Sequence, residues 1–464
     1  RTTRSKGSRR LLLYAHRTRG TSGGTLRRKA QNESLEKLAR RSTERIRKEL
    51  FQPDLDRLSS HLDAAMSLVP ELREVDLHTV VNGPIMYTPD LLPLLGPYYD
   101  LPNMWMAVGF GYGIIHSGGA GKYLADWIMK GEPPFDLIEA DPNRFGKWAT
   151  KQYVFDKAAE TYGMNNTYTY PKSNLTGWEQ PMWFSKHPDA HQSEYQPNLT
   201  PFAKFDVTGP DSATFLDKML ANKLPKKGKT NISHLLTPSG KVYAEITVTR
   251  LTDDHFFLIT GSGSEIHDLR WLKDHARSWN CRVDFQNLTD DMACLSIAGP
   301  NSRKVLAKLT KEDVTNSAFP FLSAKTMEVA DIPVRALRLS YTGELGWELY
   351  HPAKHTDALY KALLDAGTEF EIGDFGTYAL NTLRLEKGFR MWGAEMNMDS
   401  NPLEAGLDYF IRMDKQDFIG KAALEKVLQE GLSRKLVYLK VHSKNADPDG
   451  NESIWCCNKV RTFC

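Results

Sequence analysis

Cysteine is scarce in this chain, and long apolar runs are missing from it. Five cysteines occur among 464 residues, and Cys456, Cys457 and Cys464 crowd together near the end of the sequence. This spacing matches neither a disulfide framework nor a set of metal ligands, so a reducing compartment fits best. No apolar run approaches the length of a membrane-spanning helix, so we expect no membrane span.

Acidic residues are absent from the first 32 positions. That segment carries ten Lys and Arg. The other 432 residues carry 50 basic and 57 acidic side chains and so have a net charge of −7, although the net charge of the whole chain is +3. We therefore expect no nucleic-acid partner for the body of the protein. The Arg-rich opening, with scattered Ser and Thr, has the composition of a mitochondrial transit segment but begins at Arg1. A basic tail or a truncated gene model explains it equally well.

The residues that are present predict an α+β multidomain fold. The chain is 41% hydrophobic and 25% charged, and its 464 residues accommodate about two or three domains. Apolar residues at helical spacing run from Leu55 to Val69, a strand is predicted at Val80, and another runs from Asn103 to Gly113. Further helices are predicted at 212–220, 264–279 and 376–390, and further strands at 242–251, 256–262, 294–300 and 334–340.

Glycines gather before a predicted helix in the first third of the chain. Gly118 and Gly119 lead into a helix whose expected apolar face is Tyr123, Leu124, Trp127 and Ile128. Small residues at a helix start let a ligand approach backbone N–H groups at the positive end of the helix, where the edge of a flavin would be stabilised. Close packing of helix on strand explains the same glycines.

The predicted strand VYAEITVTRL has an apolar and a polar face. Val242 and Ala244 begin the apolar alternation, which places Tyr243, Glu245 and Thr247 on the other face. In a solvated sheet that face is surface. If it lines a pocket, Glu245 is a candidate acid or base.

The segment SYTGELGWELY, residues 340–350, predicts a tight turn between two strands. Gly343 and Gly346 permit the turn, which leaves Glu344 projecting from a loop. A carboxylate there accepts two hydrogen bonds and matches the paired N–H donors along one edge of a pterin. An ordinary solvated hairpin tip has the same sequence features.

Long motifs in the chain resemble the dimethylglycine dehydrogenase family over roughly residues 49–458, and more distantly sarcosine dehydrogenase and the regulatory subunit of pyruvate dehydrogenase phosphatase. The motifs that carry this resemblance are NGPIMYTPDLLPLLGP, GFGYGIIHSGG, GEPPFDLIEADPNRFGKW, GWEQPMWF, NISHLLTPSGKVYAEITV, LITGSGSEIHDLRW, SYTGELGWELYH, FGTYALNTLRLEKGFR and NPLEAGLDYF.

The resemblance implies two activities on one polypeptide and a mitochondrial matrix location. An amine-oxidase-type domain with FAD would oxidise an N-methyl group of dimethylglycine or a similar amino acid, yielding sarcosine. Tetrahydrofolate, in an aminomethyltransferase-like domain, would capture the one-carbon unit. Holding folate beside the iminium makes the capture effectively intramolecular. The resemblance also suggests electron-transfer flavoprotein as electron acceptor.

The family's site residues carry over by position. Glu344 corresponds to the pterin-binding Glu of the YTGE motif, Tyr341 flanks it, and Arg384 of the RLE motif orients the folate. Glu245 takes the place of an Asp that contacts the folate nitrogen, and is a candidate general base. A loop over the flavin corresponds to Gly109, Gly111, Gly113, Gly118 and Gly119 and includes His116, for which a structural role is favoured over catalysis.

The chain also departs from the family pattern. It has no G-x-G-x-x-G turn at its start to hold a dinucleotide, and the segment before the folate domain is short. The closing residues CCNKVRTFC do not match, and they resemble out-of-frame or intronic translation. We expect a basic disordered arm at 1–48, the C-terminal portion of the FAD domain at 49–160, a linker at 161–200, the folate domain at 201–430 and the start of a β-barrel at 431–464.

Two other readings stay open. The first is a non-catalytic protein like the phosphatase regulatory subunit, against which the motifs NISHLLTPSGKVYAEITV and GEPPFDLIEADPNRFGKW weigh. The second is a free-standing aminomethyltransferase, which the FAD-domain remnant at 80–131 disfavours.

The missing dinucleotide turn gives a first prediction. We expect the 464-residue chain, expressed and purified, to hold no stoichiometric flavin and to be an inactive partial form, because its main FAD anchor is absent. An absorption spectrum decides this, and a stoichiometric flavin band would contradict it.

Overall fold

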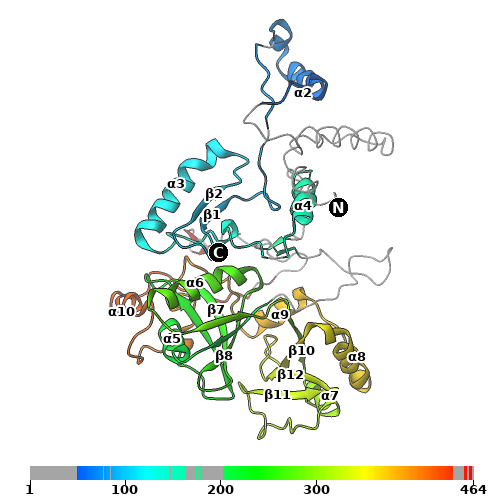
Figure 1. Cartoon of the computed structure of the whole chain (residues 1–464), viewed down its shortest axis with the longest axis vertical. Coiled ribbons are helices and arrows are strands. Elements are labelled where there is room, and N and C mark those ends of the chain that lie inside the picture. Colours follow the sequence, from blue (N-terminus) through cyan, green and yellow to red (C-terminus); the bar gives the residue numbers. More distant parts are fainter. Residues whose placement is uncertain are drawn as a thin grey trace. The chain divides into compact units, whose positions relative to one another are not determined.

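The computed structural model describes residues 50–163 apart from 77, 84 and 147, residues 202–440, and the short segments 174–175, 178–179, 442, 454–456 and 459–461. The chain divides into two compact units (Figure 1), one of residues 1–124 and 139–177, the other of residues 125–138 and 178–464. The predicted arm at 1–48 lies outside the described residues, as does nearly all of the predicted linker at 161–200.

The first unit contains a small antiparallel hairpin and helices, and α3 continues past the division between the units. The elements are α2 (Leu55–Leu68), η2 (Pro70–Glu74), β1 (Leu94–Pro97), β2 (Trp105–Val108), α3 (Gly113–Lys130), η3 (Ile138–Ala140) and α4 (Lys151–Gly163). The helix predicted from Leu55 is confirmed. The strand predicted at Val80 is wrong, because Thr88 and Asp90 cap a turn through side-chain hydrogen bonds and strand β1 begins only at Leu94.

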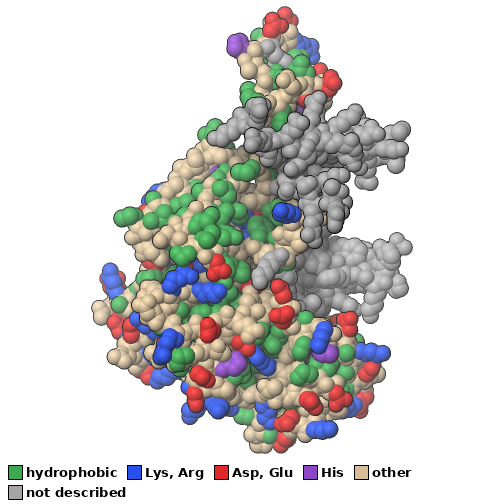
Figure 2. Space-filling view, in the orientation of Figure 1, with side chains coloured by type: hydrophobic (Ala, Val, Ile, Leu, Met, Phe, Trp, Pro, Cys, Tyr) green, Lys and Arg blue, Asp and Glu red, His purple; other side chains and the backbone are tan. Residues whose placement is uncertain are grey.

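Helix α3 begins earlier than predicted. It starts at Gly113, so Gly118 and Gly119 lie inside it, and the N–H of His116 donates to the carbonyl of Tyr112 at 3.1 Å. Tyr123 and Trp127 are buried as expected, but Ile128 is exposed. Figure 2 shows hydrophobic side chains gathered on this part of the first unit, and Ile114 is 96% exposed.

A buried arginine ties two separate segments of the first unit together. Arg144 donates from Nε and Nη2 to the carboxylate of Asp90 at 2.7 and 2.8 Å. It also donates to the carbonyl oxygens of Leu92, Pro93 and Asp141. This bidentate, charge-assisted pair fixes the segment that leads into β1.

The second unit is built on two antiparallel sheets. The five-stranded sheet has the order β6-β7-β8-β5-β9, with α5 and α6 in its connections, and the four-stranded sheet has the order β10-β13-β12-β11, with α7 and α8 (Figure 1). The elements of the first group are β5 (Ala203–Thr208), α5 (Ser212–Met219), β6 (Lys229–Leu236), β7 (Val242–Arg250), β8 (His255–Thr260), η4 (Ser262–Ser264), α6 (Glu265–Ser278) and β9 (Asp284–Asn287). Those of the second are β10 (Met292–Ala298), α7 (Ser302–Leu309), β11 (Ala324–Val329), β12 (Ile332–Leu337), β13 (Gly346–Pro352), η5 (Ala353–His355), α8 (Thr356–Gly367) and η6 (Thr368–Phe370).

The strands and helices predicted in this region are confirmed to within a few residues, because period-two and helical patterns are strong there. Helix α9 (Thr377–Glu386) is shorter than predicted, and a long irregular segment leads from it through η7 (Asp408–Phe410) to α10 (Lys421–Glu430). The described chain also contains the short strands β3 (Asn174–Leu175), β4 (Trp178–Glu179), β14 (Ile454–Cys456) and β15 (Lys459–Arg461). None of the described helices has the length and apolar character needed to cross a bilayer.

The two sheets share a core that contains charged groups. Phe257 of β8 packs with Cys294 of β10 and Tyr350 of β13. Arg335 of β12 pairs with both carboxylate oxygens of Asp206 on β5, at 2.6 and 2.9 Å. Asp206 is paired in register with Phe257, and Arg335 with Tyr350, so the ion pair links the two sheets next to these apolar contacts.

Removing the Arg144 guanidinium should loosen the first unit. We expect Arg144→Ala to lower the free energy of unfolding of this unit by about 3–5 kcal/mol, because the Asp90 carboxylate, which is only 12% exposed, loses its charged partner. Hydrogen exchange of the amides in β1 and β2 measures this. The control is Arg282→Ala, which breaks an exposed pair with Asp211 in the second unit and should leave the protection of the hairpin unchanged. Equal protection of the hairpin in both variants would contradict the role of Arg144.

The partly buried carboxyl of Glu348 should make stability depend on pH. Burial raises its pKa to about 7, while a hydrogen bond from the Tyr350 hydroxyl acts in the opposite direction. As pH rises, the unfolded state releases this proton first, near the ordinary value for glutamate of about 4.3, so stability is lost until the pH passes the folded pKa.

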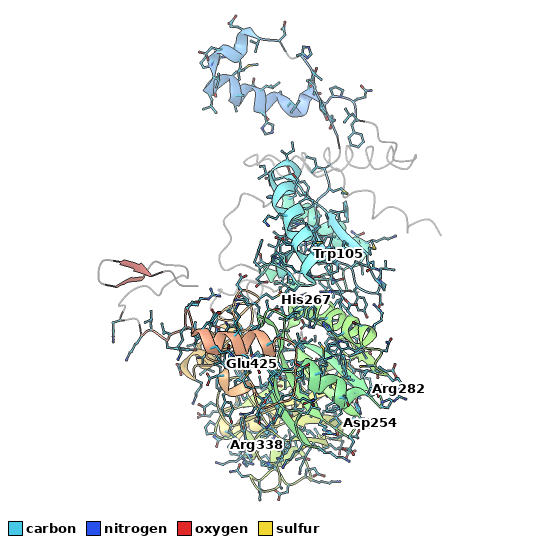
Figure 3. All side chains as sticks on the ribbon, turned by 90° about the vertical axis from the view of Figure 1, so that its left-hand side faces the viewer. Trp105, Asp254, His267, Arg282, Arg338 and Glu425 are labelled. Carbon is cyan, nitrogen blue, oxygen red and sulfur yellow. The ribbon has the colours of Figure 1, made fainter. Side chains whose placement is uncertain are left out.

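Glu348→Gln stays neutral at every pH. We expect its free energy of unfolding, relative to the unmodified chain, to rise by on the order of 2 kcal/mol between pH 5 and pH 8. Denaturant unfolding at both pH values measures the change. The exposed Glu425→Gln (Figure 3) should show no such change, and a pH-independent difference for Glu348→Gln would contradict the prediction.

Candidate functional site

Glu245 is the accessible carboxylate on a strand that is otherwise largely buried. Strand β7 lies between β6 and β8, and its predicted polar face is not solvated, because the Tyr243 ring stacks on His267 and Trp271 of α6 at 4.3 Å (Figure 3 labels His267). The Glu245 side chain keeps 31% of its surface exposed. This face is therefore covered by α6 at Tyr243 and partly open at Glu245.

Tyr341 lies close to Glu245. Its hydroxyl donates to the carbonyl of Arg390 at 2.6 Å, and its ring stacks on Phe389 with centroids 6.1 Å apart. Burial raises the pKa of Tyr341, the charge of Glu245 raises it further, and Arg384 opposes both. The structure therefore places the Tyr341 hydroxyl within electrostatic reach of both Glu245 and Arg384.

Arg384 is buried on α9, although it is a charged residue. It is 2% exposed, whereas the neighbouring apolar side chain of Leu385 is 37% exposed. The guanidinium lies 2.7 Å from Glu395 and donates to the side chain of Asn381 and the carbonyl of Phe389. These partners offset the cost of burying the charge, and they tie the end of α9 to the segment that follows it.

Glu344 projects from the predicted turn, but it is already paired. Gly343 has a φ of +70°, and a β-carbon there would overlap the side chain of Lys387. The Glu344 side chain is 46% exposed, and its Oε1 lies 3.2 Å from Nζ of Lys387. The loop position is confirmed, whereas an inward, unpaired carboxylate is not what the structure has. A pterin would have to share Glu344 with Lys387.

The predicted flavin residues separate into two groups. Gly109 has a φ of +80°, and a β-carbon there would lie 2.9 Å from Thr88, while one at Gly111 would overlap the ring of Tyr87. Close packing explains both of these glycines.

The other predicted flavin residues are not in a loop. Gly113, His116, Gly118 and Gly119 belong to α3, so the loop conformation predicted for these four residues is wrong. His116 is exposed and contacts the ring of Tyr112. No described atom lies within 4 Å of a β-carbon placed at Gly118 or Gly119, so this part of the helix leaves its backbone open to approach.

A cavity of about 370 Å³ lies elsewhere in the second unit. It is bounded by β10, the start of α7, α8 and residues 371–376, and none of the predicted folate residues lines it. Among the described residues, no group of three or more His, Cys, Asp or Glu side chains could hold a metal ion.

Sequence reasoning missed three residues of this region. In the sequence, Glu395 is one carboxylate in a predicted polar loop, and Lys387 is a basic residue directly after the RLE motif. Neither position indicates an ion pair. His234 lies opposite Glu245 on β6 and had no signal except its place in the ISHLLTP motif. Each of the three contacts a residue that is distant in sequence or on another strand, and the spacing of residues along the chain does not predict such contacts.

Comparison with protein families shows what this architecture is. The family model described as the GCVT N-terminal domain matches residues 162–415, more than half of the chain. The chain belongs to this family. Two further models match the preceding part, the FAD dependent oxidoreductase at residues 12–127 and the FAD dependent oxidoreductase central domain at 130–177. The predicted combination of an FAD-domain portion and an aminomethyltransferase-like domain is confirmed.

Individual relatives agree with this assignment. The chain is 51% identical to mitochondrial dimethylglycine dehydrogenase of Mus musculus and 50% identical to that of Homo sapiens, over 89% of this chain and 53% of each relative. It is 32% identical to an aminomethyltransferase of Caldanaerobacter subterraneus, over 58% of this chain and 74% of that protein. The predicted resemblance is confirmed, and the chain spans about half the length of the dehydrogenases it matches.

Proposed function

We propose that this chain accepts a one-carbon unit onto tetrahydrofolate, as part of a flavin-dependent enzyme that demethylates dimethylglycine, or a similar N-methyl amino acid, to sarcosine. The similarity to dimethylglycine dehydrogenases and the adjoining FAD oxidoreductase and GCVT matches support this proposal. We further propose electron-transfer flavoprotein as electron acceptor and the mitochondrial matrix as location. The domain limits of 1–48, 49–160, 161–200, 201–430 and 431–464 likewise remain proposals.

The observation that carries the proposal is the convergence of three side chains from distant parts of the chain. Glu245 comes from β7, Tyr341 from the turn before β13, and Arg384 from the end of α9, and the charges of Glu245 and Arg384 both act on the Tyr341 hydroxyl. An accessible carboxylate beside a stacked aromatic pair fits a ligand that is flat and carries N–H groups.

The chain's own residues would carry out the capture step. FAD, when bound, would supply the removal of hydride from the N-methyl group. As the folate nitrogen forms its bond to the electrophilic carbon, it becomes cationic and loses a proton, which Glu245 would accept. Tyr341 and Phe389 would form a wall for the pterin. Arg384 would hold Glu395 and the carbonyl of Phe389 in place.

Two sets of residues would hold the cofactors. Tyr341, Glu344 and Arg384 are proposed for folate. Gly109, Gly111, Gly113, His116, Gly118 and Gly119 are proposed for the flavin side, where the exposed backbone at Gly118 and Gly119 suits the approach of a planar ring.

Titration calorimetry of tetrahydrofolate into the 464-residue chain tests the proposal. We expect one saturable site, and Glu344→Gln should weaken binding by about 1–3 kcal/mol, because it replaces a charged acceptor of paired hydrogen bonds. Glu328→Gln, at an exposed position of β11, is the control and should leave the affinity unchanged. Equal affinities for all three proteins would remove Glu344 from the site, and no binding at all would overturn the proposed function.

A further inference from the structure

A buried histidine lies directly behind Glu245. His234 on β6 is in register with Glu245 on β7, and its side chain is completely buried. Its Nε2 lies 3.6 Å from Oε2 of Glu245. The ring of Phe410 covers another side, with centroids 6.0 Å apart.

Neither ring nitrogen of His234 has a hydrogen-bond partner within the described part of the chain. Buried polar side chains are nearly always hydrogen-bonded, so an unsatisfied imidazole in a strand calls for an explanation. The acceptor that faces one of its nitrogens is the Glu245 carboxylate, at a distance slightly too long for a full hydrogen bond. A small movement of the carboxylate would close this gap.

We propose that His234 is a positioning residue of the folate site, which holds Glu245 in its proton-accepting orientation by donating from Nε2–H. This inference rests on the proposed function. Glutamate has three rotatable side-chain bonds, so a carboxylate exposed on one side needs a fixed donor on the other to keep a single orientation.

The groups near Glu245 differ in exposure and role. The charges of Glu245, Arg384 and Glu395 all act on the Tyr341 hydroxyl, whereas His234 is fully buried next to Glu245. When the folate nitrogen gives its proton to Glu245, the Nε2–H of His234 remains in place. The proton balance of the step therefore involves only the folate nitrogen and Glu245.

The alternative is that His234 merely fills space. Its neighbours Leu235 and Leu236 are fully buried, and a leucine at position 234 would also suit an apolar interior. Replacement by leucine and by glutamine separates the two roles, because only glutamine keeps an N–H donor.

The experiment measures the affinity of the 464-residue chain for tetrahydrofolate in four variants: His234→Leu, His234→Gln, Glu245→Leu, and the double variant His234→Leu with Glu245→Leu. We expect His234→Leu to weaken binding about tenfold and His234→Gln to restore most of the loss. In the Glu245→Leu background, His234→Leu should have no further effect. Wild-type affinity in His234→Leu, or an undiminished loss in the double variant, would overturn the inference.

A second measurement needs no folate and no variant of His234. Nitrogen-15 NMR of the histidine rings in the unmodified chain, with His234 identified by its changed signal in Glu245→Leu, should show the Nε2–H tautomer. The Nδ1–H tautomer would overturn the inference. If the unmodified chain binds no tetrahydrofolate, the proposed function fails, while the tautomer still decides whether His234 donates to Glu245.

Discussion

The candidate site depends on one buried guanidinium. Arg384 lies in the last turn of α9, and its partners are Asn381 in the same helix, the carbonyl of Phe389 and the carboxylate of Glu395. Phe389 in turn stacks on Tyr341. A single charge therefore fixes the end of a helix, the loop that follows it and one aromatic wall, and removing it would leave Glu395 without its cation.

Much of the second unit could be predicted from sequence. Its strands have clear alternation and its helices clear apolar stripes, so their positions agree with the structure to within a few residues. The first unit was harder, since prolines and glycines interrupt its patterns. The sequence predicts a strand at Val80. In the structure the side chains of Thr88 and Asp90 hold a turn, and the first strand begins after it, at Leu94. Gly118 looked like a helix start, but α3 already runs from Gly113.

At the site, too, sequence motifs predicted which residues matter, but not which contacts they make in the folded protein. Glu245, Tyr341 and Arg384 could be named because each belongs to a motif, and in the structure the charges of Glu245 and Arg384 both act on the Tyr341 hydroxyl. That Arg384 is buried while Leu385 is exposed depends on the irregular segment folding over α9, which periodicity does not report. The pairing of Glu344 with Lys387 likewise depends on a turn approaching the end of a helix distant in sequence.

The core between the two sheets also determines how one thiol behaves. Cys294 is buried beside Glu348 and Tyr350, and this burial raises the pKa of its thiol far above the ordinary value. Thiolates, and not thiols, react with alkylating and oxidising reagents, so the folded protein shields Cys294 from them. Modification of Cys294 would thus proceed only when the sheets separate, and its rate would report how often the second unit opens.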